Sequence, residues 1–207
     1  SECWVGVEMD GTVIVRSGVT DIGAGQISAL GQIAVEVLGV TLENVVIYNS
    51  DSAVTPLAGT TTATRALYMT GNAAKLAAEA VRERLAGRAA QEFGVEIDEI
   101  DMAFNVVSVL DNPEKSMAFV DLVKICAAEG VHRSELSMFR APFSDYLDPE
   151  TGQGQAHPDY VYGAQAIEVA VDIDTGEVEV VKSIAAHDIG QCINKAAVEG
   201  QIEGGTQ

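Results

Sequence analysis

Three segments of this 207-residue sequence carry residues suited to binding a phosphate or another polar anion. The first is Gly23-Ala24-Gly25, which stands between a predicted strand and a predicted helix. Glycines at such a junction let backbone amides and the positive end of a helix dipole approach an anion. The segment lacks the dinucleotide fingerprint, because Ser28 stands at its last glycine position. An anion site and a plain strand-to-helix turn both fit this pattern, and the plain turn is favoured.

The second and third segments are rich in hydroxyl groups and in glycine, respectively. Thr62, Thr64 and Arg65 stand where a hydroxyl-rich loop runs into a predicted helix, and they suit a phosphate or a polar heterocycle, although threonines also cap helices. Residues 194–205 contain Gln201 and three glycines. Glycines inside a helix lower its stability, so they indicate the close approach of another backbone or of a ligand. None of the three segments is specific by itself.

The sequence offers no self-contained catalytic or metal site. His132, His157 and His187 lie far apart and lack the spacing of paired metal ligands. Cys192 stands beside a glycine in a predicted loop, where a reactive thiol and a small apolar filler are both possible and the filler is favoured. We therefore assign no catalytic residue and no metal ligand within this chain.

The composition limits the partners of the protein. Twelve Lys and Arg residues against 31 Asp and Glu residues give a formal net charge of −19, which repels nucleic acid and anionic lipid. No apolar run approaches the roughly 20 residues that span a bilayer. The three cysteines form no CxxC pair, which is typical of a reducing compartment. We expect a cytoplasmic protein that binds neither nucleic acid nor a membrane.

The elements that must position these segments mix hairpins with helices. Alternating or β-branched runs predict strands at residues 3–9, 12–19, 45–47, 102–110, 135–139, 160–173 and 177–186. Helical spacing predicts helices at residues 27–38, 64–93, 120–128 and from 195 onward, with a surface loop at 142–159. Asp10-Gly11 and Asp174-Thr175-Gly176 are hairpin turn signals. Strict strand–helix alternation is absent, which indicates an α+β fold of mixed sheets with helices packed on them.

We expect two α+β subdomains. The first, residues 1–94, contains the glycine segment and the threonine segment. The second, residues 95–207, is expected to be truncated within its last helix, because the sequence stops soon after the helix start at Asn194. The first strand begins at once and Met is absent from position 1, so the chain is expected to be a piece of a longer protein.

Taken in order, these segments resemble the large subunit of the xanthine dehydrogenase and aldehyde oxidase family, the molybdenum hydroxylases. The glycine segment with its helix resembles the family's first cofactor loop, and the threonine segment resembles the second. The end of the chain is the most specific match, whereas residues 95–156 match loosely. The matching stretches are 20–26, 36–39, 51–73, 169–176, 187–194 and 200–205.

The resemblance implies part of the C-terminal molybdopterin-binding region of a hydroxylase or dehydrogenase. Such enzymes oxidise purines, other nitrogen heterocycles or aldehydes with oxygen derived from water. The cofactor-binding positions implied by the match are Gly23, Ala24, Gly25, Gln26, Thr62, Thr64, Arg65 and Gln201. Ala24 stands where many members carry a glutamine, which removes one side-chain hydrogen bond to the cofactor. The family's catalytic glutamate falls after this sequence, so the fragment is expected to be inactive and free of molybdenum when isolated.

The resemblance also implies partners. These are the remainder of the large subunit, iron–sulfur clusters and FAD on other domains or subunits, and a small heterocycle or aldehyde as substrate. A non-catalytic α+β interaction module is the alternative, in which the glycine loops are only turns and the acidic surface recruits a basic partner. A nucleotide-phosphate binding domain is disfavoured by the missing fingerprint.

Overall fold

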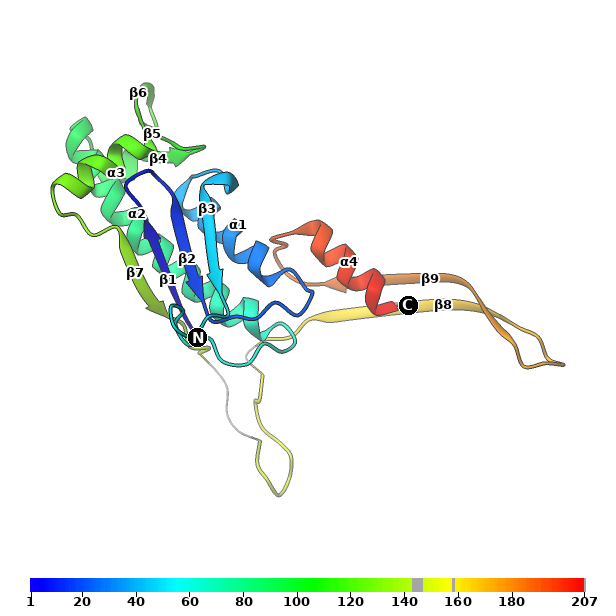
Figure 1. Ribbon diagram of the computed structural model, residues 1–207. Helices are drawn as coiled ribbons and strands as arrows, with labels where there is room; N and C mark the ends of the chain where they lie inside the picture. Colours follow the sequence, from blue (N-terminus) through cyan, green and yellow to red (C-terminus); the bar gives the residue numbers. More distant parts are fainter. Residues whose placement is uncertain (143–146, 158, 207) are drawn as a thin grey trace. The chain divides into compact units, whose positions relative to one another are not determined.

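The computed structural model describes residues 1–142, 147–157 and 159–206 (Figure 1). The chain divides into two compact units, Ser1–Arg140 and Ala141–Gln207. This division differs from the boundary expected after residue 94, which lies inside the first unit. The difference arises because a strand near residue 136 completes the sheet that begins at residue 2. Both units combine strands and helices, so the expected α+β class with mixed sheets is confirmed.

Helices and strands alternate irregularly along the chain. The first unit contains β1 (Glu2–Val7), β2 (Val13–Ser17), α1 (Gln26–Leu38), η1 (Leu42–Asn44), β3 (Val45–Asn49), η2 (Leu67–Gly71), α2 (Asn72–Phe93), η3 (Ile97–Glu99), β4 (Ile100–Ala103), β5 (Val106–Val109), β6 (Asn112–Ala118), α3 (Phe119–Ala128) and β7 (Ser134–Met138). The second contains β8 (Tyr162–Val171), β9 (Val178–Asp188) and α4 (Lys195–Thr206). In the described residues, no helix is both long and apolar enough to cross a membrane.

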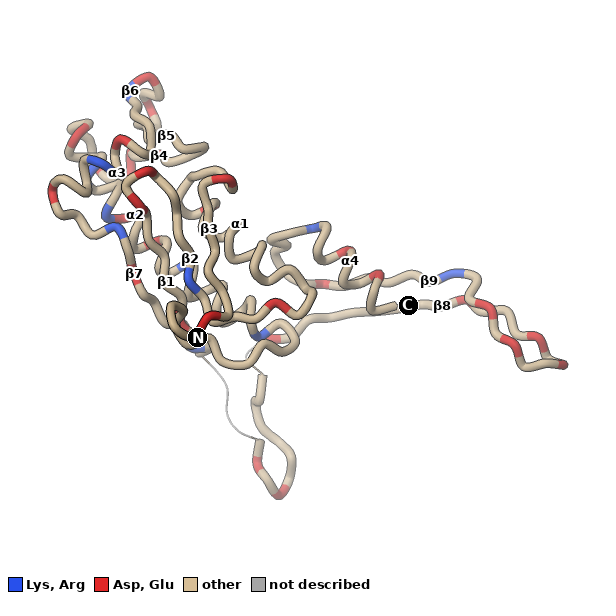
Figure 2. Tube along the Cα trace, viewed as in Figure 1, with Lys and Arg blue, Asp and Glu red and all other residues tan. Residues whose placement is uncertain are grey.

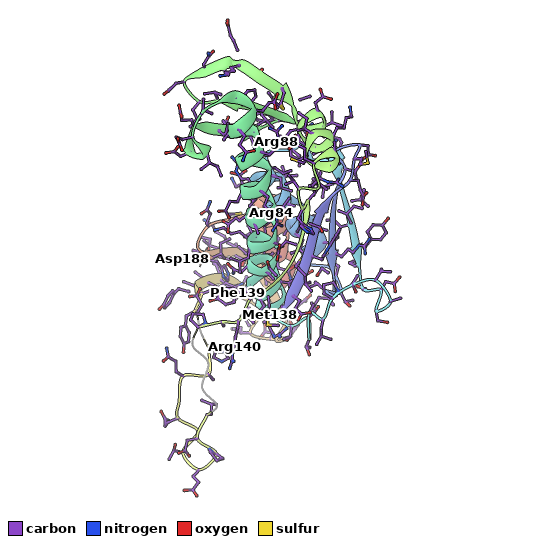
Figure 3. The ribbon with its side chains drawn as sticks, turned by 90° about the vertical axis from the view of Figure 1, so that its left-hand side faces the viewer. Arg84, Arg88, Met138, Phe139, Arg140 and Asp188 are labelled. Carbon is purple, nitrogen blue, oxygen red and sulfur yellow. The ribbon has the colours of Figure 1, made fainter. Side chains whose placement is uncertain are left out.

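A four-stranded sheet in the order β3-β2-β1-β7 forms the frame of the first unit. β1 pairs antiparallel with both β2 and β7, whereas β2 and β3 run parallel and are connected through α1. A parallel pair needs such a crossover, because a tight turn can only reverse the chain. α1 packs against β2 and β3, and α2 packs against β1 and β7. Figure 3 shows α2 along one side of these strands.

The core lies between this sheet and the two helices. Alternate residues of the strands, among them Val5 and Val15, are fully buried, as period-two side-chain geometry requires. The buried face of α2 is lined largely by alanines, which let the helix approach the sheet closely. Arg84 on α2 fixes this packing, since its guanidinium donates to Glu135 at 2.9 Å and to the Ser134 carbonyl at 3.0 Å in β7. The helix and sheet are thus joined by apolar contact and by charge.

The second sheet of this unit corrects one prediction. The single strand expected at 102–110 is two strands, β4 and β5, which pair antiparallel. The chain reverses at Phe104 and Asn105, whose φ angles are +51° and +64°. β6, which the sequence did not predict, completes the order β4-β5-β6. Its side chains are mostly exposed, so no apolar alternation marked it as a strand.

The second unit is a long hairpin followed by a helix, as predicted. β8 and β9 pair antiparallel around the Asp174-Thr175-Gly176 turn. α4 begins where expected, because the Ala197 amide donates to Oδ1 of Asn194 at 3.0 Å and caps the first turn. Within the described part of this unit, no side chain is buried.

Candidate functional site

The first two candidate segments start side by side at one edge of the four-stranded sheet. β2 and β3 are parallel, so their carboxyl ends lie at the same edge (Figure 1). The Ser50 amide donates to the Ser17 carbonyl at 3.2 Å, and the Ser50 hydroxyl donates to the Val19 carbonyl at 3.0 Å. Ligand sites of sheets with parallel strands commonly lie beyond such carboxyl ends. The loops that follow Ser17 and Asn49 are therefore the candidate site.

The two loops remain in contact beyond the strands. The Thr20 amide donates to the Thr61 hydroxyl at 3.3 Å, which ties the glycine segment to the threonine segment. Beneath them, Val19, Ala58 and Ala66 form a small buried cluster of their own. From the sequence, the Gly23–Gly25 loop, the Thr62–Arg65 loop and Gln201 are all expected to converge at one edge of the fold. The structure brings the first two loops together.

The carboxylate of Asp21 organises the start of α1. Oδ1 accepts from the Gly23 amide at 2.8 Å and the Gly25 amide at 3.4 Å, and Oδ2 accepts from the Ile27 amide at 3.4 Å. These amides, led by that of Gly23, hold the pKa of Asp21 below its usual value by stabilising the charged form. The amides expected to face an external anion are therefore already satisfied by a side chain of the same chain.

This role of Asp21 was not part of the sequence-based assignment. The pattern of an aspartate two residues before a glycine, at the entrance to a helix, is a known local hydrogen-bonding motif and was the signal available. Gly23 and Gly25 have φ angles of +103° and +74°, so the glycines are needed to wrap the loop around the carboxylate. Open space lies above Gly23, and Ala24 is exposed.

Gln26 is the most unusual residue of the site. It is the first residue of α1, the residue is only 6% exposed, and its Oε1 atom is buried without a hydrogen-bond donor in the described structure. A buried carbonyl oxygen left without a donor costs about 1–3 kcal/mol. Such a group next to an exposed glycine loop is suited to accept a hydrogen bond from a ligand.

The threonine loop presents hydroxyl groups and is closed by Arg65. The Arg65 guanidinium donates through Nη1 to the Thr60 carbonyl at 2.7 Å and to the Ala58 carbonyl at 3.4 Å. Part of its hydrogen-bonding capacity thus shapes the loop, rather than waiting for a phosphate. Thr62 and Thr64 are exposed.

The backbone between this loop and α2 is unusual in two further ways. Ala63 has a φ of +43°, a conformation that side chains other than glycine rarely adopt. The π-helical segment η2 follows, and Thr70 within it is fully buried with Oγ1 unpaired among the described residues. Strained backbone and π-helical turns are frequent at functional sites.

The remaining candidates lie apart from this edge. Gln201 is an exposed residue of α4 in the second unit, and its approach to the two loops stays a prediction. In the described residues, no group of three His, Cys, Asp or Glu side chains is placed to hold a metal ion. Cys3 and Cys126 are buried free thiols, and burial raises the pKa of Cys3 to about 12. Cys192 is exposed.

Comparison with known proteins identifies the family. The model of the molybdopterin cofactor-binding domain matches residues 1–207. The chain belongs to this family. It is 30% identical to the nicotine 6-hydroxylase large subunit of Paenarthrobacter nicotinovorans, over 96% of this chain and 24% of that protein. It is 27% identical to the xanthine dehydrogenase molybdenum-binding subunit of Escherichia coli O157:H7, over 99% of this chain and 27% of that protein.

A solved structure supports the same relationship. The aldehyde oxidoreductase of Desulfovibrio desulfuricans ATCC 27774 superposes with a TM-score of 0.71 at 30% identity, over 99% of this chain and 20% of that one. The chain therefore spans 24% of the nicotine 6-hydroxylase large subunit, 27% of the xanthine dehydrogenase subunit and 20% of the aldehyde oxidoreductase. The resemblance to the xanthine dehydrogenase and aldehyde oxidase family is confirmed, and the family does not favour the interaction-module alternative.

Proposed function

We propose that this chain forms part of the cradle for the molybdopterin cofactor in a longer hydroxylase or dehydrogenase. The observation that carries the proposal is the buried, unpaired Oε1 of Gln26 beside the exposed loop at Gly23. A pterin edge bears N–H donors that would satisfy this oxygen. The molybdenum cofactor would supply the redox chemistry, and the protein supplies position and electrostatics.

Each candidate residue has a part in this proposal. Gly23 and Gly25 carry no side chain, so a ligand can approach the backbone of this loop closely. Gln26 accepts from the pterin, while the exposed hydroxyls of Thr62 and Thr64 donate to polar or phosphate oxygens. Ala24 contributes its small size, and Arg65 holds the threonine loop in shape. Gln201 adds its amide from α4.

The negative charge of Asp21 limits which part of the ligand can lie beside the start of α1. Its charge lies at the start of α1, where a phosphate would otherwise bind. Two anions at one helix start repel each other, so the neutral pterin ring suits the Gln26 side of the site. A phosphate suits the threonine loop, which carries Arg65 and exposed hydroxyls.

The proposed activity of the parent protein follows from the activities for which its relatives are named. We propose oxidation of a purine, another nitrogen heterocycle or an aldehyde, with oxygen derived from water. The remainder of the large subunit would supply the catalytic base and further cofactor contacts. Iron–sulfur clusters and FAD on other domains or subunits would accept the electrons, in a cytoplasmic enzyme. The isolated chain is proposed to be inactive.

The test compares molybdenum and pterin content of the full-length parent protein with that of single variants. Gln26→Leu removes the unpaired acceptor, and we expect molybdenum per protomer to fall by about tenfold, equivalent to roughly 1.4 kcal/mol. Gln91→Leu makes the same change at an exposed position of α2 and should leave the content unchanged. Full molybdenum in Gln26→Leu and in a Thr62→Ala, Thr64→Ala double variant would refute this site.

A further inference from the structure

The helix that follows the threonine loop contains one irregular turn. Residues 65–66 are α-helical, η2 is π-helical, and α2 continues the same helical path to Phe93. A π-helical turn holds one more residue than an α-helical turn. Because an α-helix turns about 100° and rises about 1.5 Å per residue, this extra residue determines the direction in which the preceding loop leaves the helix. The conformation of η2 therefore determines how Thr62, Thr64 and Arg65 are presented.

The hydrogen bonds of Asn72 explain why this turn is not α-helical. In a regular α-helix, the Tyr68 carbonyl would accept from the backbone amide of residue 72. That amide donates to the Met69 carbonyl instead. The Tyr68 carbonyl accepts from Nδ2 of the Asn72 side chain, at 2.6 Å. The side chain of Asn72 thus replaces the backbone donor that the π turn removes.

No other polar side chain of this segment supports the turn. Residues 66–74 contain no Asp, Glu, Lys or Arg, so this stretch is tan in Figure 2 and no ion pair fixes its conformation. Thr70 is fully buried, and its Oγ1 atom has no partner among the described residues. Within residues 67–72, all of which the structure describes, only Asn72 forms a side-chain hydrogen bond. The π turn therefore depends on Asn72.

The surroundings of η2 are fixed on both sides. The Tyr68 ring packs edge to face on the Phe139 ring, with 5.8 Å between the centroids. A Cβ at Gly71 would meet Cδ1 of Ile33 at 3.2 Å, so glycine lets η2 pack closely on α1. The hydrogen bond between the threonine loop and the glycine loop fixes the preceding segment. Loss of the extra residue from the turn would therefore displace the threonine loop.

We propose that Asn72 is a positioning residue of the candidate cofactor site. Its hydrogen bond to the Tyr68 carbonyl holds the π turn, and the π turn places the threonine loop beside the glycine loop. Without this donor the carbonyl is unpaired, and the segment gains by returning to a regular α-helix. Asn72 acts through the loop and has no contact with the cofactor in this proposal, which rests on the proposed function.

The first experiment measures the loop without the cofactor. The full-length parent protein is produced in a host that makes no molybdopterin, and hydrogen exchange of peptides covering residues 60–66 is followed by mass spectrometry. Asn72→Ala removes the donor and favours an α-helix. Asn72→Ser keeps a donor, because a serine hydroxyl in a helix can donate to the carbonyl four residues earlier. We expect exchange about tenfold faster in Asn72→Ala and close to wild type in Asn72→Ser. Gln91→Ala, at an exposed position of α2, is the matched control.

The second experiment measures molybdenum in the same variants after production in a host that makes the cofactor. Asn72→Ala should hold at least about threefold less molybdenum than wild type, and Asn72→Ser should be close to wild type, because a displaced binding loop loses its geometry. Unchanged exchange in Asn72→Ala, or an Asn72→Ser variant that behaves like Asn72→Ala, would overturn the inference. Should Asn72→Ala fail to fold, Asn72→Asp takes its place, since an ionised carboxylate has no donor.

A parallel measurement separates this inference from the proposed function. Full molybdenum in Asn72→Ala overturns the positioning role. If Gln26→Leu has lost molybdenum in the same series, the failure concerns Asn72 alone. Full molybdenum in both variants means that the proposed cofactor site fails as well.

Discussion

The Asp21 carboxylate and the Gly23 amide are joined by a hydrogen bond of 2.8 Å at the entrance to α1. The carboxylate places a negative charge of the same chain at the start of this helix. A helix start that already holds an anion is stable without a ligand. The candidate site is therefore preformed at its first loop, and recognition falls to the neighbouring Gln26 and to the threonine loop.

Replacing Asp21 by alanine should lower the free energy of unfolding of the 207-residue chain by about 1 kcal/mol at neutral pH, because the amides of Gly23, Gly25 and Ile27 lose their acceptor. The pKa of Asp21 is lowered by folding, so its charge stabilises the fold above the unfolded pKa near 3.9. That contribution is lost as the pH falls through the folded pKa. Urea unfolding at pH 7 and in acid should show the difference from wild type shrinking in acid. Asp111→Asn, at an exposed position, is the control.

The unpaired oxygen of Gln26 is expected to lower the stability of the cofactor-free chain. Gln26→Met removes the unpaired Oε1 while keeping a long flexible side chain, so the cofactor-free chain should become more stable by about 1 kcal/mol. The same change in the parent protein should reduce cofactor content. Thermal unfolding of the chain and metal analysis of the parent measure the two effects. A clear loss of stability in the chain would show that Gln26 serves the fold.

The sequence predicted those parts of the fold that local physics determines. The first hairpin and α1 follow from alternation, helical spacing and a glycine stop at Gly39, and all are present. The sequence did not predict the break between β4 and β5, because Phe104 and Asn105 adopt left-handed backbone angles without a glycine. It did not predict β6, because an edge strand needs no apolar face. Tertiary context determines such elements.

Part of the arrangement at the candidate site could be predicted from the sequence. The two loops and Gln201 were expected at one edge, and the parallel pairing of β2 with β3 brings the two loops together there. The hydrogen bonds of Asp21 to the loop amides and the burial of the Gln26 oxygen were not foreseen. Both depend on the path of the loop in three dimensions, which the spacing of residues does not determine.

Two glycines with similar backbone angles should respond differently to alanine. Gly39 and Gly94 end α1 and α2 with φ angles of +69° and +66°. A Cβ at Gly39 would overlap the Met102 carbonyl, whereas one at Gly94 meets nothing within 4 Å. Gly94→Ala should cost about 1 kcal/mol from backbone strain alone, and Gly39→Ala about 3 kcal/mol or more. Denaturant unfolding of both variants measures this, and equal costs would contradict the close packing of α1 on β4.

The ion pairs formed by α2 should contribute unequally to the free energy of unfolding. The Arg88 guanidinium is only 14% exposed and binds both carboxylate oxygens of Glu129, at 2.6 and 2.9 Å (Figure 3 labels Arg88). Arg88→Ala should destabilise the chain by about 1–2 kcal/mol. The pKa of Glu129 is lowered chiefly by hydrogen bonding from Arg88. The contribution of this ion pair to the free energy of unfolding is therefore lost as the pH falls through the lowered pKa of Glu129.

Lys75 provides the matched comparison for Arg88 on the same helix. Its pair with Glu79 spans 3.7 Å, and both side chains are about half exposed. Lys75→Ala should change stability by less than about 0.5 kcal/mol. Urea unfolding at low and high salt measures both variants. Equal losses for Arg88→Ala and Lys75→Ala would contradict the ranking.

The position of β7 beside β1 has a consequence for synthesis of the protein. Gly6 pairs with Ser134, so the sheet joins residues separated by more than a hundred positions. Long-range pairings of this kind slow folding, because a large loop must close first. On a ribosome, one edge of β1 stays unpaired until residues 134–138 emerge. Nascent chains stalled before that point should expose an open strand edge, which favours chaperone binding and aggregation.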